Sequence, residues 1–115
     1  MRQSSRASAT VFALVLVSVT AFHDPADAAP APVIVKISNF VFDAETLTVP
    51  PGTTVTWVNQ DDDPHTIVSD DMTSFHSRAL DTNESFSFTF AKPGTFGYFC
   101  SIHPHMTGKV VVKAP

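Results

Sequence analysis

The chain contains a single cysteine, Cys100, so it cannot form an intramolecular disulfide. Small exported domains often depend on disulfides, because their hydrophobic cores are small. A lone thiol in an oxidising compartment is open to oxidation unless something occupies the sulfur. A bound metal ion would occupy the sulfur and also help to hold a small core together. The cysteine content therefore points to a metal ligand and excludes a disulfide framework.

Basic side chains are also scarce. Between residues 29 and 115, five lysines and arginines stand against nine aspartates and glutamates, which gives a net charge of −4. No basic stretch that could follow a phosphate backbone is present, so nucleic acid is not expected as a partner. The acidic excess is interpreted mainly as a source of solubility.

The amino-terminal segment has the order of a secretory signal peptide. Residues 1–6 carry two arginines, a mostly apolar run extends from Ala7 to Phe22, and Ala26-Asp27-Ala28 is a small-x-small cleavage signal. The apolar run is too short to span a bilayer comfortably. We therefore expect residues 1–28 to be cleaved, which leaves residues 29–115 as one domain, periplasmic or otherwise exported and without stable membrane insertion.

The rest of the chain predicts an all-β fold. Ser85–Phe90 shows the cleanest alternation, with three phenylalanines on one face and hydroxyl groups on the other. Pro50-Pro51-Gly52 predicts a tight turn, and no segment after the signal peptide has a convincing helical period. About seven short strands with regular turn signals are typical of a two-sheet sandwich. The predicted strands cover residues 33–37, 47–49, 53–59, 65–69, 85–90, 95–100 and 109–113.

Four side chains carry the chemistry: His65, and then Cys100, His103 and Met106 in one short segment. One thiolate, two imidazoles and one thioether are the donors of a type 1, or blue, copper site, in which methionine is the weak axial ligand. Cys100 ends a strand that faces inward, and the turn after it can bring His103 and Met106 back to the same metal. Taken singly, the cysteine and methionine suit a core and the histidines a surface. The spacing Cys-x-x-His-x-x-Met favours one copper ion, cycling between Cu(I) and Cu(II).

These motifs resemble the plastocyanin and amicyanin group of the cupredoxin family. The similarity extends from Val55 to Val112, and the two-residue gap between His103 and Met106 is similar to that of amicyanin in particular. The resemblance implies a Greek-key, two-sheet β-sandwich of seven to eight strands with copper near one end. It also implies an electron carrier whose copper ligands are His65, Cys100, His103 and Met106.

Three positions depart from the family pattern. Thr66 stands where amicyanin and plastocyanin have an asparagine that ties the two ligand-bearing segments together, so its hydroxyl is expected to do this. His76 is interpreted as a surface histidine and not as a ligand of a second metal, because no partner ligand is evident. His105 replaces a large apolar residue at the surface where electrons leave, so the identity of the partner cannot be carried over.

The sequence thus predicts a small, soluble, monomeric carrier of single electrons, and not an enzyme. Larger redox proteins are expected to dock near His103, on an apolar rim formed by Ile102, Pro104 and His105. The alternative is an exported protein for copper storage or delivery, but Met-rich and His-rich tracts are absent. Copper enzymes need an additional open metal site and further domains, for which residues 29–115 leave no room.

Overall fold

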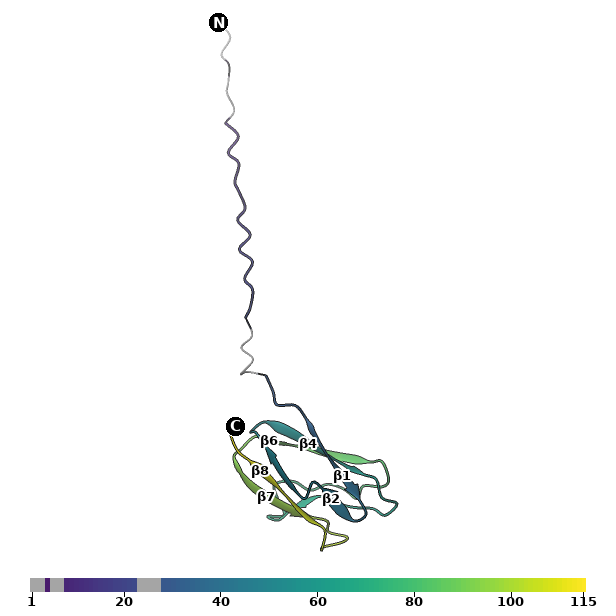
Figure 1. The fold of residues 1–115 in the computed structure, drawn as a ribbon. Helices are drawn as coiled ribbons and strands as arrows, with labels where there is room; N and C mark the ends of the chain where they lie inside the picture. The colour runs from purple at the N-terminus through teal and green to yellow at the C-terminus, as the bar shows by residue number, and fades with distance from the viewer. Residues whose placement is uncertain (1–3, 5–7, 23–27) are drawn as a thin grey trace.

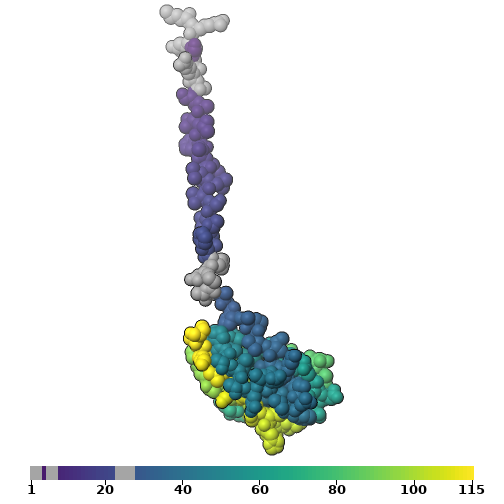
Figure 2. Space-filling model, in the orientation of Figure 1, coloured from purple at the N-terminus to yellow at the C-terminus, as the bar shows by residue number. Residues whose placement is uncertain are grey.

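The computed structural model describes residue 4, residues 8–22 and residues 28–115. Residues 8–22 form neither helix nor strand, and their large apolar side chains are exposed (Figures 1 and 2). No helix among the described residues is long and apolar enough to cross a membrane. Ala26 and Asp27 of the predicted cleavage signal lie outside the described residues, so the signal peptide stays a prediction.

Within the described residues, eight strands form two four-stranded sheets that pack face to face (Figure 1). The first sheet has the order β2-β1-β4-β6, with β1 at Val33–Ser38, β2 at Val41–Asp43, β4 at Thr53–Asn59 and β6 at Ser85–Phe90. The second has the order β3-β8-β7-β5, with β3 at Thr46–Val49, β8 at Thr107–Val112, β7 at Gly94–Phe99 and β5 at Val68–Ser69. The pairs β1–β4 and β3–β8 are parallel. The pairs β1–β2, β4–β6, β5–β7 and β7–β8 are antiparallel. The predicted all-β sandwich is confirmed.

The core lies between the sheets and is centred on Trp57. Residues of β4 alternate between buried and half-buried, as the period of two in its sequence predicts. The centroid of the Trp57 ring lies 6.1 Å from the ring centroid of Phe75, 6.0 Å from that of Phe86 and 5.3 Å from that of Tyr98. Full burial of a large apolar side chain contributes about 1.5–3 kcal/mol, so this aromatic cluster supplies much of the stability that a disulfide-free domain needs.

Apart from shifts of one or two residues at strand ends, such as β7 ending at Phe99 and not at Cys100, two details differ from the predicted strands. The strand expected at residues 65–69 is shorter, since only Val68–Ser69 belong to a sheet, and His65 makes an isolated bridge with Leu80 instead. Pro64 precedes His65 and has no N–H to donate to a ladder. Strand β2 was not predicted, because its three residues are too few to show a period.

The turn predicted at residues 50–52 is confirmed. Gly52 has φ +90°, which fits the third position of a type II turn, and the N–H of Thr53 donates to the carbonyl of Pro50 at 3.3 Å. A second turn, Asn39-Phe40, joins β1 to β2 and has positive φ at both residues, 54° and 59°. That pattern is type I′, which matches the twist of the strands that it connects.

Candidate metal centre

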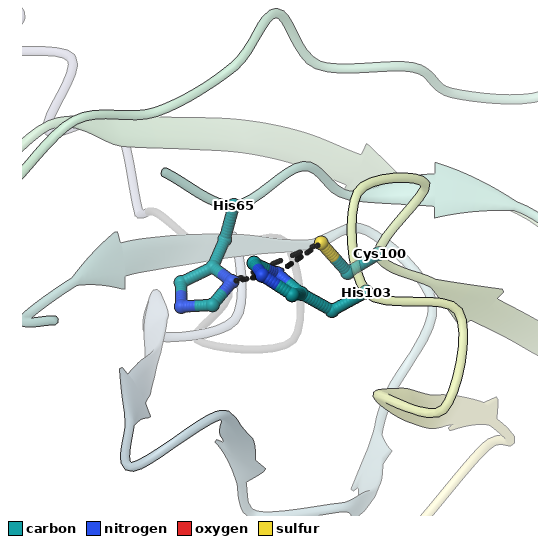
Figure 3. A group of neighbouring side chains, drawn as sticks. All are labelled: His65, Cys100 and His103. Carbon is teal, nitrogen blue, oxygen red and sulfur yellow. Dashed lines mark hydrogen bonds between the residues drawn. The ribbon is translucent and has the colours of Figure 1, made fainter. Parts of the chain in front are cut away.

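His65, Cys100 and His103 each bring one ligand atom to the same place (Figure 3). The Sγ atom of Cys100 lies 3.8 Å from Nδ1 of His65 and 3.8 Å from Nδ1 of His103, and the two Nδ1 atoms are 3.2 Å apart. A metal ion with bonds of about 2.0 Å to nitrogen and about 2.3 Å to sulfur would hold its ligands roughly 3–4 Å from one another. The three side chains therefore fit one metal ion.

The segment from Cys100 to Met106, called here the ligand loop, connects β7 to β8. The first and last residues of the loop are joined by a hydrogen bond from the N–H of Cys100 to the carbonyl of Met106, at 3.0 Å. Within it, the N–H of Met106 donates to the carbonyl of His103 at 2.9 Å. Cys100 and Met106 are buried, whereas His103 is half-buried. The fold thus brings together the ligand atoms of His65, Cys100 and His103. It places Met106, which is buried, at the end of the same loop.

His65 arrives from the opposite side of the site and is fully buried. Its N–H donates to the carbonyl of Leu80 at 3.1 Å, and the N–H of Leu80 donates back to its carbonyl at 2.7 Å. The side chain of Asn59 donates to the carbonyls of Leu80 and Asp63, both at 2.8 Å. These bonds tie the segment that carries His65 to the end of β4, so the first histidine has a fixed backbone.

Thr66 connects the two ligand-bearing segments. Its N–H donates to Sγ of Cys100 at 3.3 Å, and its hydroxyl oxygen accepts from the N–H of Ser101 at 2.8 Å. The hydroxyls of Thr66 and Ser101 are also 2.8 Å apart. The role expected for the Thr66 hydroxyl is therefore confirmed. A hydrogen bond to a thiolate stabilises its negative charge, which is the state that binds metal.

Asp61 was not predicted to take part in the site, because it was interpreted as one of the acids that confer solubility. Its Oδ2 atom lies 2.9 Å from Nε2 of His65, and its carboxylate also accepts from the N–H groups of Asn39 at 2.7 Å and Phe40 at 2.9 Å. Burial raises the pKa of Asp61, but the bonds from Phe40, Asn39 and His65 together lower it below its ordinary value. The signal that could have revealed it is a carboxylate four residues before a predicted ligand.

Phe40 was also missed. Its ring meets the His65 ring edge-on at 5.2 Å and the His103 ring edge-on at 5.0 Å, although 45% of the residue is exposed. An exposed phenylalanine in a turn gives no sequence signal of such a contact. His76, by contrast, is exposed and is not part of the metal-binding group found within the described ranges.

Comparisons with known proteins agree with this geometry. The family model described as a cupredoxin-like domain matches residues 9–112. Amicyanin of Paracoccus versutus is 35% identical over an alignment of 101 residues, which covers 83% of this chain and 72% of that protein. Plastocyanin of Scenedesmus fuscus is 36% identical over an alignment of 85 residues, which covers 64% of this chain and 87% of the plastocyanin. A purple cupredoxin from Nitrosopumilus maritimus, of known structure, matches with a TM-score of 0.68 and 34% identity, over 70% of this chain and 99% of its own.

The chain belongs to the cupredoxin family. Its fold and its set of donors are those of the type 1 copper electron carriers of the amicyanin and plastocyanin group, which are not enzymes, as the sequence predicted.

Proposed function

We propose that the protein carries single electrons between larger redox proteins and that His65, Cys100, His103 and Met106 hold its one copper ion. The convergence of one thiol sulfur and two imidazole nitrogens within 4.8 Å of one another is the observation that supports this most directly. When bound, copper supplies one-electron exchange between Cu(I) and Cu(II) in a donor set that suits both states.

The residues around the site favour fast exchange because they are held in place before any electron moves. Cys100 and His65 are fully buried, and Thr66 bonds to both the sulfur and the ligand loop. Ligands that are fixed by their surroundings need little rearrangement when the charge at the site changes. A buried sulfur is also protected from solvent and from oxidation.

His103 is the ligand nearest to solvent, and we propose that partners dock around it. Exposed apolar side chains border it on the ligand loop, where Ile102 is 44% exposed, and on the neighbouring turn, where Phe40 is 45% exposed. Pro104 and His105 are exposed as well. A small surface of this kind suits redox partners, which associate weakly and separate quickly.

We also propose that residues 1–28 are a cleaved signal peptide and that residues 29–115 act as a monomer in the periplasm or elsewhere outside the cytoplasm. The order of basic, apolar and small residues supports export. Mass spectrometry of the protein secreted by a bacterial host tests the cleavage. A mature chain that begins at Ala29 is expected, and an intact amino terminus would contradict the proposal.

The visible spectrum of the copper-loaded protein tests the site. We expect an intense thiolate-to-copper absorption that bleaches on reduction and is absent from Cys100→Ser, while an exposed control variant, Ser101→Ala, keeps the absorption. A colourless copper complex would contradict a type 1 site. A blue protein that loses copper to a chelator faster than it exchanges electrons would instead support copper delivery.

A further inference from the structure

The turn between β1 and β2 is strained in a way that its own sequence does not relieve. Asn39 and Phe40 both have positive φ, 54° and 59°. Asparagine adopts this region readily, but a bulky residue such as phenylalanine does so rarely, at a cost of roughly 1–2 kcal/mol. Type I′ turns usually place glycine at this second position. An interaction outside the turn must therefore hold Phe40 in its conformation.

The carboxylate of Asp61 supplies that interaction. Oδ1 accepts from the N–H of Asn39 at 2.7 Å, and Oδ2 accepts from the N–H of Phe40 at 2.9 Å. Both backbone donors of the turn thus bond to one side chain that is 21 and 22 residues away along the chain. The Asp61 side chain is only 12% exposed, whereas the two backbone donors lie in an exposed turn at the surface.

The same Oδ2 atom also lies 2.9 Å from Nε2 of His65, the ring nitrogen that faces away from the other ligand atoms. Nδ1 of His65 faces the other ligand atoms, so Nε2 is the nitrogen that carries the proton when Nδ1 binds a metal. A carboxylate bonded to the outer nitrogen of a metal-binding histidine fixes the tautomer and the orientation of the ring and makes the imidazole a stronger donor.

Phe40 completes the arrangement, since its ring is nearly perpendicular to both imidazoles, at 90° to His65 and 88° to His103. Edge-to-face contacts between aromatic rings contribute about 0.5–1.5 kcal/mol. His103 otherwise lies on an exposed loop, so this contact restrains the one ligand ring that could turn towards water.

We infer that Asp61 and Phe40 are positioning residues that together clamp both imidazoles of the metal site. Asp61 holds the His65 ring directly and, through the turn, holds the Phe40 ring against His103. The clamp deepens the proposed function, because it assigns to two residues outside the ligand set the orientation of the ligands. If the clamp acts in this way, the geometry and the reduction potential of the site depend on the turn between β1 and β2, which belong to the sheet that does not carry the ligand loop.

Asp61→Asn tests the carboxylate, with Asp62→Asn as the matched control, because Asp62 is an exposed neighbour of the same charge. An asparagine has one acceptor oxygen, so it cannot accept at both positions that Asp61 serves. In the metal-free protein, NMR should show solvent exchange of the His65 Nε2 proton about tenfold faster in Asp61→Asn, the factor expected for one lost bond to a charged group. In the copper protein the potential should rise more in Asp61→Asn than in Asp62→Asn.

Phe40→Leu tests the ring, with Val41→Leu as the control, because Val41 is an adjacent exposed apolar residue. NMR relaxation of the metal-free protein should show a more mobile His103 ring in Phe40→Leu alone. Equal proton exchange in both asparagine variants, or an equally mobile His103 ring in both leucine variants, would overturn the clamp. These readouts need no metal, so they are distinct from a failure of the native protein to form a blue site, which would contradict the proposed function instead.

Discussion

The hydroxyl oxygen of Thr66 accepts a hydrogen bond from the N–H of Ser101 at 2.8 Å, across 35 residues of sequence. Each of these residues directly follows a proposed ligand, His65 in one case and Cys100 in the other. The bond therefore joins the two ligand-bearing segments beside the ligands themselves. Thr66 is 6% exposed and Ser101 is exposed, so the bond is partly buried.

Thr66→Val should lower the free energy of unfolding of the metal-free protein by about 0.5–1.5 kcal/mol, because the partly buried bond from the Ser101 N–H loses its acceptor while the shape of the side chain is preserved. Thr66→Ser keeps the hydroxyl and should lose much less. Urea denaturation of both variants measures the difference. Equal stability of the valine and serine variants would show that the hydroxyl is not what joins the segments.

Met106→Leu should keep the blue colour and raise the reduction potential. Removing a weak axial donor disfavours Cu(II) more than Cu(I), whereas the three stronger ligands stay in place. Voltammetry and the visible spectrum of the copper protein measure the two effects. A potential and a spectrum that both match those of the native protein would exclude Met106 as the axial ligand.

His105→Asp should slow electron exchange with the native partner while leaving the spectrum unchanged. His105 is exposed beside His103 on the ligand loop, so a new charge there disturbs docking without touching the ligands. Stopped-flow kinetics with the partner measures the rate, and Lys113→Asp, at the exposed end of the chain, serves as the control. If both variants exchange electrons as fast as the native protein, docking occurs elsewhere.

The sandwich could be predicted because its longer strands show a clear alternation of apolar and polar residues. The alternation of Ser85–Phe90 and of Thr53–Asn59 matches the burial that the structure gives them. Strand β2 could not be predicted, because three residues after an Asn39-Phe40 turn show neither a period nor a glycine signal. The strand predicted at residues 65–69 was too long, because only Val68–Ser69 belong to a sheet. Apolar residues near a ligand are buried whether or not they join a sheet.

The three clustered ligands could be predicted because metal chemistry restricts residue type and spacing at once. Asp61 was not predicted, because a carboxylate in a run of three acids is typical of a soluble surface, and its spacing of four residues from His65 indicates a contact only weakly. Phe40 depends on a turn that folds back from the other sheet, and a contact between such distant segments leaves no local pattern.

Gly108→Ala should destabilise the domain, because a Cβ atom at Gly108 would lie 2.4 Å from Oη and Cζ of Tyr98. Tyr98 cannot easily move away, since it is buried and packs against Phe42 at 4.8 Å and Trp57 at 5.3 Å. Overpacking of this kind costs typically about 1–3 kcal/mol. Urea denaturation should show the loss, with the exposed neighbour Thr107→Ala as the control. An alanine variant as stable as the control would mean that the Tyr98 ring can shift away from Gly108, its partner on the neighbouring strand.

Asp71 should make the stability of the domain depend on pH in the acid range. Its carboxylate accepts from the hydroxyls of Ser69 and Ser74 and from the N–H groups of Ser74 and Thr73, and these bonds hold the pKa of Asp71 well below its ordinary value. A folded-state pKa below that of the unfolded chain means that the ionised carboxylate stabilises the fold above about pH 4, the ordinary value for aspartate. That contribution is lost as the pH falls below this value towards the folded-state pKa.

Asp71→Asn removes this titration, so the variant should be less stable than the native protein at pH 7, and the difference should shrink as the pH falls from about 4 to 2, below the ordinary aspartate value. Thermal unfolding across this range measures it. Asp62→Asn is the control, because the Asp62 carboxylate makes no hydrogen bond within the part of the chain that the structure describes. A difference between native and Asp71→Asn proteins that stays constant with pH would show that Asp71 does not couple protonation to folding.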